Sequence, residues 1–200
     1  MYKFNNITTI AFDADDTLWE NENNYRDTET EFCKLLKDFG NPEFVSSELL
    51  KTEISNIEIY GYGAKSFTLS MIETAIRISN GNCGTEIISK IIEASKELIN
   101  MPVKLLPDVE NTLAILSKKY KLILATKGDL LDQERKLNNS GLAKYFEHVE
   151  IMSNKRKEDY VNLINKLKIK PTEFMMVGNT IKSDVLPVIE AGATAIHIPY

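Results

Sequence analysis

The chain has 200 residues, of which 43% are hydrophobic and 26% are charged, and its formal net charge is −5. This composition is typical of a globular protein and is sufficient for one domain with an insertion, or for two small domains. No segment concentrates lysine and arginine, so we expect no nucleic-acid partner. No apolar stretch is long enough to span a bilayer, so we expect no membrane partner.

The cysteine and histidine contents exclude several classes of site. Cys33 and Cys83 are too few for a disulfide framework, and the N-terminus lacks the apolar region of a signal peptide, so we expect a reduced, cytoplasmic protein. His148 and His197 lie in strand-like runs. A histidine-based triad or a zinc site is therefore poorly supported.

The first predicted element is a buried strand, Ile7–Phe12, which leads into Asp-Ala-Asp-Asp-Thr at residues 13–17. Three carboxylates within four residues repel one another in a site without water, unless a cation or a shared proton relieves the repulsion. A polar turn at the end of the strand is the alternative, since aspartate is common in turns.

Residues 23–98 contain four helical stripes of apolar side chains. The boundary signals are Gly40 after the first stripe, Ser46 or Ser47 before the second, Asn80-Gly81 after the third and Thr85 before the fourth. Four helices joined by short glycine-containing links predict a small bundle.

After Pro102 strand and helix patterns alternate. A helix is predicted after Pro107-Asp108, and strands are predicted at Lys121–Thr126, His148–Met152, Phe174–Gly178 and Thr194–Ile198. Short apolar strands separated by helices predict a parallel sheet covered on both faces. We therefore predict an α/β fold. Residues 1–20 and 102–200 form a Rossmann-like core, and residues 21–101 form an α-helical bundle inserted after the first strand.

Ligands of open parallel sheets bind beyond the carboxyl ends of the strands, so the residues that follow each strand define the candidate site. In chain order they are Asp13, Asp15 and Thr17; Thr126, Lys127, Gly128 and Asp129; Lys155, Arg156 and Lys157; and Asn179, Thr180, Ser183 and Asp184. Carboxylates, a hydroxyl beside a glycine and lysines suit a hard, oxygen-seeking cation together with a phosphoryl group.

These residues resemble the haloacid dehalogenase (HAD) superfamily, in its Mg²⁺-dependent phosphatase type. The resemblance rests on DxDxT at Asp13–Thr17, the apolar strand that ends in Thr126, a lysine near residue 155, and GNxxxSD at Gly178–Asp184. A helical cap inserted just after the first motif is common in that family. The resemblance therefore covers nearly the whole chain.

The resemblance implies a Mg²⁺-dependent hydrolase of small-molecule phosphomonoesters that forms an aspartyl-phosphate. Asp13 would be the nucleophile, and Asp15 would protonate the leaving oxygen and then deprotonate water. Mg²⁺ would bind an oxygen of Asp13, the backbone carbonyl of Asp15 and the carboxylate of Asp184. Asp15 also favours phosphoryl chemistry over carbon–halogen cleavage, because a halide leaves without a proton. Asp16 is interpreted as a turn residue, or as a residue that contacts the Mg²⁺ ligands without binding the metal.

The resemblance also assigns the phosphate-binding groups. The Thr126 hydroxyl and the N–H groups near Lys127 and Gly128 would bind the phosphate. Lys155 would neutralise its charge, and Lys157 is the alternative.

Three further features stay open at this stage. Many relatives carry aspartate where Asn179 stands, and a carboxamide offers an oxygen to the metal or a hydrogen bond to the phosphate. In the cap, Tyr62 and Lys65 are candidates to contact the substrate, against a plain helix–helix turn. Trp19 and Glu20 are candidates to line the entrance.

Two other functions are compatible with these motifs: a phosphomutase of the same family, and a catalytically idle binding protein, for which Asn179 is the argument. The expected partner is a small phosphorylated metabolite, and the protein is expected to be a monomer or a homodimer. The chain ends at Tyr200, directly after the last predicted strand. Relatives commonly continue there, so a shortened C-terminus is one explanation.

Overall fold

The computed structural model describes residues 6–200 and divides into two compact units. One unit comprises the residues up to Glu20 together with Val103–Tyr200, and the other comprises Asn21–Pro102. In the described part of the chain, every strand belongs to the first unit and the second unit is helical.

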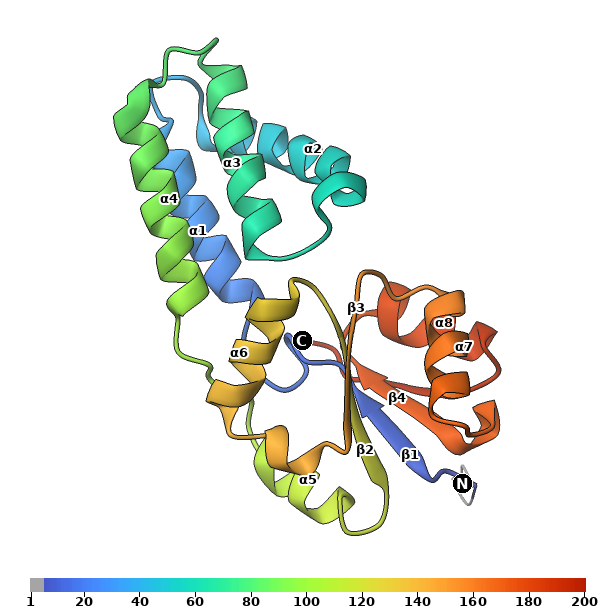
Figure 1. The fold of residues 1–200 in the computed structure, drawn as a ribbon. Coiled ribbons are helices and arrows are strands. Elements are labelled where there is room, and N and C mark those ends of the chain that lie inside the picture. Colours follow the sequence, from blue (N-terminus) through green and yellow to red (C-terminus); the bar gives the residue numbers. More distant parts are fainter. Residues whose placement is uncertain (1–5) are drawn as a thin grey trace. The chain divides into compact units, whose positions relative to one another are not determined.

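The first unit is built on a parallel sheet with the strand order β3-β2-β1-β4-β5 (Figure 1). The strands are β1 (Thr9–Phe12), β2 (Lys121–Lys127), β3 (His148–Met152), β4 (Phe174–Gly178) and β5 (Thr194–His197). In the central strand, Phe12 pairs with Leu124 of β2 and with Val177 of β4. The predicted α/β fold with a Rossmann-like parallel sheet is confirmed, although β1 begins two residues later than predicted.

Helices cover both faces of this sheet. They are α5 (Val109–Leu116), α6 (Leu130–Ser140), α7 (Lys157–Lys166) and α8 (Leu186–Glu190). Ile10 and Phe12 of β1 pack into an apolar cluster that includes Leu113 of α5 and Leu137 of α6. Ala11 lies between them in sequence and joins the opposite cluster, which includes residues of α7 and α8. This division follows from the alternation of side chains along a strand.

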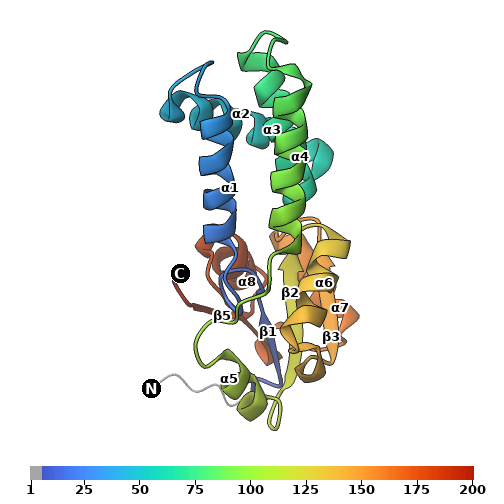
Figure 2. The ribbon, with the colours of Figure 1, turned by 90° about the vertical axis from the view of Figure 1, so that its left-hand side faces the viewer.

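The second unit consists of four helices, as the four apolar stripes predict. They are α1 (Glu22–Leu35), α2 (Pro42–Tyr60), α3 (Ala64–Ile78) and α4 (Gly84–Asn100). Figure 2 shows α1 and α4 side by side. Phe32, Leu49, Met71 and Ile91 each come from a different helix and meet in one buried cluster.

Three of the predicted helix boundaries are wrong. Helix α2 begins at Pro42 rather than after Ser46 or Ser47, because the Asn41 side chain caps it by accepting a hydrogen bond from the Phe44 N–H (2.8 Å). Helix α4 begins at Gly84, so Thr85 lies inside it. Helix α1 ends at Leu35, before Gly40.

Helices α2 and α3 pack against each other partly through buried polar side chains. The Thr74 hydroxyl donates to the Thr52 hydroxyl (2.9 Å), and Asn56 Nδ2 donates to Ser70 Oγ (3.1 Å). All four side chains are almost completely buried. Because these groups satisfy one another, the layer fixes how the two helices are aligned without leaving unpaired polar groups.

Two properties of the described residues bear on the cellular setting. In residues 6–200 no helix combines the length and the apolar character needed to cross a bilayer. Cys33 and Cys83 are both free thiols, buried in the apolar cluster of the helical unit.

Glu53 of α2 is expected to destabilise the protein as the pH rises. Burial, with Glu29 and Glu22 nearby, raises the pKa of Glu53 from 4.5 to about 7. At pH values between 4.5 and about 7, Glu53 is protonated in the folded protein and deprotonated in the unfolded chain. The stability that is present below pH 4.5 is therefore lost as the pH rises through about 7.

Replacing Glu53 with glutamine keeps the size of the side chain and removes this dependence. Because Glu53 is partly exposed, solvent screening limits the effect to about 1 kcal/mol, or about 2–4 °C in Tm at pH 8. Thermal unfolding at about pH 5 and pH 8 measures it, with Glu58→Gln, an exposed position on the same helix, as the control. A gain in Tm of the same size at both pH values would contradict the assignment.

Candidate active site

Asp13 lies at the carboxyl end of the central strand and is held there by backbone and side-chain contacts. Its N–H donates to the Val177 carbonyl (2.9 Å), which continues the pairing of β1 with β4. The Thr17 hydroxyl donates to Asp13 Oδ2 (3.2 Å). Asp13 is buried, at 7% exposure. The DxDxT motif thus supplies both the carboxylate and a hydroxyl that orients it.

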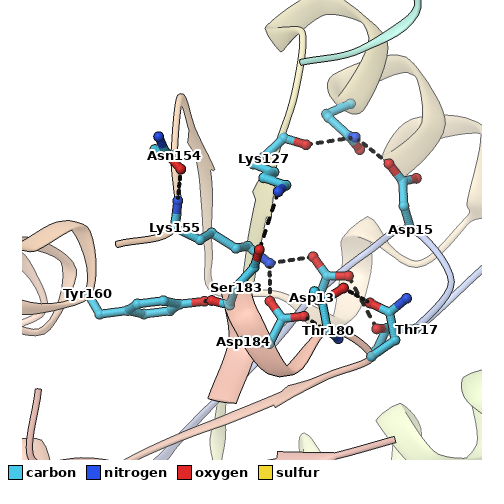
Figure 3. Close-up of polar contacts among 12 residues, drawn as sticks. Asp13, Asp15, Thr17, Lys127, Asn154, Lys155, Tyr160, Thr180, Ser183 and Asp184 are labelled. Carbon is cyan, nitrogen blue, oxygen red and sulfur yellow. Dashed lines mark hydrogen bonds and ion pairs between the residues drawn. The ribbon is translucent and has the colours of Figure 1, made fainter. Parts of the chain in front are cut away.

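Lys155 lies between two buried carboxylates (Figure 3). Its Nζ contacts Asp13 Oδ1 and lies 2.6 Å from Asp184 Oδ1. Lys155 and Asp184 are 4% and 1% exposed. Lys157, the alternative lysine, is the exposed first residue of α7. The lysine that the structure brings to Asp13 is therefore Lys155, and its ammonium relieves the repulsion between the two carboxylates.

The charges of this cluster shift the pKa values of its members. Burial, opposed by Lys155 and reinforced by Asp184, raises the pKa of Asp13 to about 6. Burial alone would lower the pKa of Lys155, but Asp13 and Asp184 reverse this effect and raise it. The ammonium form of Lys155 is therefore stabilised by two carboxylates, which keep it charged near neutral pH.

Asp184 is presented by a π-helical turn, Ile181–Val185, that follows β4. The Asp184 N–H donates to the Thr180 carbonyl (2.7 Å), and the Thr180 N–H donates to Asp184 Oδ2 (3.0 Å). The Asp184 carboxylate occupies the space that a Cβ atom on Gly178 would need. A residue without a side chain at position 178 therefore allows this carboxylate to approach the strand end.

Tyr160 of α7 supports the same turn from the buried side. Its hydroxyl donates to the Ser183 carbonyl (2.9 Å), and its side chain is fully buried. Burial, followed by the negative charges of Asp184 and Asp13, raises the pKa of Tyr160, so it remains a neutral donor. Tyr160 therefore connects the helix that follows Lys155 with the turn that carries Asp184.

The carboxyl end of β2 brings Thr126 and Lys127 to this edge of the sheet, and Gly128 follows directly. Thr126 is 1% exposed at the strand end. Lys127 Nζ donates to Ser183 Oγ (3.3 Å), and burial, followed by repulsion from Lys155, lowers the pKa of Lys127. The Gly128 N–H makes a long hydrogen bond of 3.4 Å to the Met152 carbonyl. The side chain of Lys127 thus points to the turn that carries Asp184.

Asp15 is oriented away from Asp13 and Lys155 (Figure 3). Its carboxylate accepts hydrogen bonds from Trp19 Nε1 (2.7 Å), Gln133 Nε2 (2.8 Å) and Lys136 Nζ (3.0 Å). Trp19, a candidate to line the entrance, is 1% exposed and packs in the apolar core. Its indole instead serves as a donor to Asp15.

Asp16, the third carboxylate of the motif, adopts a left-handed backbone conformation with φ of 58°. Its N–H donates to the Trp19 carbonyl (2.8 Å). Aspartate is one of the few residues with a side chain that adopt this conformation readily. Asp16 therefore closes the turn that separates Asp15 from Trp19.

Of two further predicted site residues, Asn179 contacts neighbouring residues of the core unit and Lys65 belongs to the helical unit. The Asn179 carboxamide oxygen accepts a hydrogen bond from the Thr180 hydroxyl (3.1 Å), and the Asn179 carbonyl lies 2.9 Å from His197 Nε2. Lys65 is the exposed second residue of α3 and belongs to the helical unit. Residues 61–63 connect α2 with α3, and Gly61 and Gly63 there have positive φ.

The donor set fits a hard cation such as Mg²⁺. Asp13 and Asp184 provide carboxylate oxygens, and Asn179 provides a carboxamide oxygen at the same strand ends. Within residues 6–200, no group of three or more His, Cys, Asp or Glu side chains forms a cage that could hold a metal ion. Mg²⁺ usually needs no such cage, because it binds through one or two carboxylates and keeps several waters or phosphate oxygens.

Three side-chain contacts of this region were not predicted from the sequence. Gln133 and Lys136 donate to the Asp15 carboxylate, and Tyr160 donates to the Ser183 carbonyl. Gln133 and Lys136 are three residues apart on α6, the helix that leaves the β2 loop. Residues three apart lie on the same face of a helix. This spacing is the feature of the sequence that could have linked Gln133 with Lys136. Their contact with Asp15 depends on tertiary packing across more than a hundred residues of sequence.

The chain is similar to several known proteins. The model of the haloacid dehalogenase-like hydrolases matches residues 7–192. Human N-acylneuraminate-9-phosphatase is 24% identical over 94% of this chain and 81% of its own length. Glyceraldehyde 3-phosphate phosphatase from Methanopyrus kandleri is 22% identical over 96% of this chain and 84% of its own. The crystal structure of a haloacid dehalogenase-like family hydrolase from Xanthomonas campestris superimposes with a TM-score of 0.93 and 36% identity, covering 98% of this chain and 82% of that one.

Proposed function

The chain belongs to the haloacid dehalogenase-like hydrolases, and we propose that it is a Mg²⁺-dependent phosphatase that hydrolyses small-molecule phosphomonoesters through an aspartyl-phosphate. The observation that carries this proposal is the buried contact of Lys155 with Asp13 and Asp184 at the carboxyl ends of parallel strands. The phosphatase names of the relatives support the same class of reaction.

In the first step, an Asp13 carboxylate oxygen attacks phosphorus in line with the leaving oxygen. The bond from phosphorus to the Asp13 oxygen forms as the bond to the leaving oxygen breaks, and Asp15 gives that oxygen its proton. In the second step, Asp15 takes a proton from water, which attacks phosphorus and breaks the bond to Asp13. Inorganic phosphate leaves, and Asp13 and Asp15 regain their initial states.

The other residues at the strand ends bind and neutralise the phosphoryl group. The Thr126 hydroxyl and the N–H of Lys127 are the proposed donors to its oxygens, and the Lys127 and Lys155 ammonium groups supply positive charge. Asp13, the backbone carbonyl of Asp15, Asp184 and Asn179 are the proposed ligands of Mg²⁺. When bound, Mg²⁺ supplies further positive charge beside the phosphoryl oxygens.

The helical unit, Asn21–Pro102, is the proposed cap that selects the substrate and excludes water. Lys65 and Tyr62, at the α2–α3 turn, are the proposed substrate contacts. The relatives named above act on an N-acylneuraminate 9-phosphate and on glyceraldehyde 3-phosphate, so the proposed substrate is a small phosphorylated metabolite. The proposal includes a cytoplasmic location, which the two buried free thiols support, and a monomeric or homodimeric state.

Hydrolysis of p-nitrophenyl phosphate with Mg²⁺, and with EDTA in its place, tests this function. We expect turnover with Mg²⁺ and a loss of at least about 100-fold with EDTA, because two buried carboxylates and a phosphate then lack the cation. A panel of sugar phosphates and nucleotides follows, and retention of the phosphate on a product would identify a phosphomutase. Equal turnover with and without the metal would contradict the Mg²⁺ requirement.

A further inference from the structure

The carboxylate of Asp15 is held by side chains of α6 that the reaction described above does not use. Gln133 Nε2 donates to one Asp15 oxygen (2.8 Å), and Lys136 Nζ donates to the other (3.0 Å). The side chains of Lys136 and Asp15 are only 17% and 23% exposed, so this ion pair is shielded from most of the solvent. The orientation of Asp15 therefore depends on α6 as well as on its own turn.

Gln133 connects Asp15 with residues 126–128, the segment proposed to bind the phosphate. The same Nε2 that donates to Asp15 also donates to the Lys127 carbonyl (3.3 Å). The amide packs against Gly128, where an added Cβ would lie 3.1 Å from Gln133 Nε2 and where φ is +140°. One buried amide thus contacts both the general acid–base and the loop that follows Thr126.

Among the described residues, a glutamine at this position leaves one buried polar atom without a partner. The side chain is 2% exposed, and within residues 6–200 its Oε1 accepts no hydrogen bond. A buried acceptor without a donor costs about 1–3 kcal/mol, which offsets part of the stability gained from the two hydrogen bonds that Nε2 donates. Rotating the amide by half a turn would place Oε1 against two other acceptors, Asp15 Oδ2 and the Lys127 carbonyl. The orientation with Nε2 toward Asp15 is therefore fixed.

We propose that Gln133 and Lys136 are positioning residues. They fix the Asp15 carboxylate relative to residues 126–128, which are proposed to bind the phosphate. The inference rests on the proposed function, in which Asp15 gives its proton to the leaving oxygen. Such a proton matters most when the leaving group is strongly basic, and matters little when the leaving group is a stable anion. Loss of the positioning contacts should therefore slow the hydrolysis of poor leaving groups selectively.

The test compares kcat/KM for phenyl phosphate, a poor leaving group, with kcat/KM for 2,4-dinitrophenyl phosphate, a good one. For Gln133→Met and Lys136→Met we expect a loss of about 10-fold or more with phenyl phosphate and of less than about 3-fold with the dinitrophenyl ester. Glu134→Met, at an exposed position of the same helix, is the matched control, and Lys136→Arg should restore most of the rate.

A second comparison separates positioning from a general structural effect. In an Asp15→Asn background, adding Gln133→Met should produce no further selective loss, because the group being positioned is gone. Equal losses with both esters, or a selective loss that persists without Asp15, would overturn the inference while leaving the phosphatase assignment intact. A parent protein that hydrolyses neither ester with Mg²⁺ would overturn both.

Discussion

Replacing Lys155 with methionine is expected to destabilise the protein by about 3–5 kcal/mol and to abolish turnover. Lys155 is the shared cation of Asp13 and Asp184, and all three side chains are buried. Its removal leaves two buried carboxylates without their counter-ion. In a chain of this size the loss corresponds to a decrease in Tm of about 6–20 °C.

Lys157→Met is the matched control for this experiment. Lys157 is two residues away, carries the same charge and is exposed at the start of α7. Urea unfolding of both variants measures the difference, and we expect Lys157→Met to lie within about 0.5 kcal/mol of the parent. Similar losses for the two variants would show that Lys155 does not balance the buried carboxylates.

Asp13→Asn is expected to lower kcat for p-nitrophenyl phosphate by at least about 1,000-fold, because a carboxamide is a far weaker nucleophile toward phosphorus than a carboxylate. Lys155 keeps its contact with Asp184, so we expect the variant to fold. Circular dichroism and thermal unfolding establish this before the rates are compared.

Asp16→Asn is the control for Asp13→Asn, because it makes the same change three residues further on. Asparagine adopts the left-handed conformation of Asp16 readily, so the turn should persist. We expect its rate to lie within about 10-fold of the parent. A larger loss with Asp16→Asn than with Asp13→Asn would reverse the proposed roles of the two residues.

The fold could be predicted from the sequence because its strands are short, apolar and separated by helical patterns. Parallel strands that are buried on both faces show this pattern, and their carboxyl ends must meet at one edge. This rule was sufficient to group Asp13, Lys155 and Asp184, which are up to 171 residues apart in sequence and which the structure brings into contact.

Contacts that depend on side-chain packing could not be predicted in the same way. Gln133 and Lys136 look like ordinary polar residues of a helix, and nothing local indicates that they reach Asp15. The π-helical turn before α8 likewise depends on tertiary contacts, among them the hydrogen bond from Tyr160 to the Ser183 carbonyl. The prediction from apolar periodicity also placed the start of α2 several residues too late. The capping side chain, Asn41, lies outside the apolar stripe.

The most direct test of the account is to trap the covalent intermediate during turnover of p-nitrophenyl phosphate with Mg²⁺. Acid quenching followed by borohydride reduction converts an aspartyl-phosphate to homoserine, which peptide mass spectrometry locates. We expect homoserine at position 13, at a level that depends on substrate and is absent from Asp13→Asn. Rapid turnover without homoserine at position 13, or with homoserine at position 15 or 184 instead, would contradict the proposed mechanism.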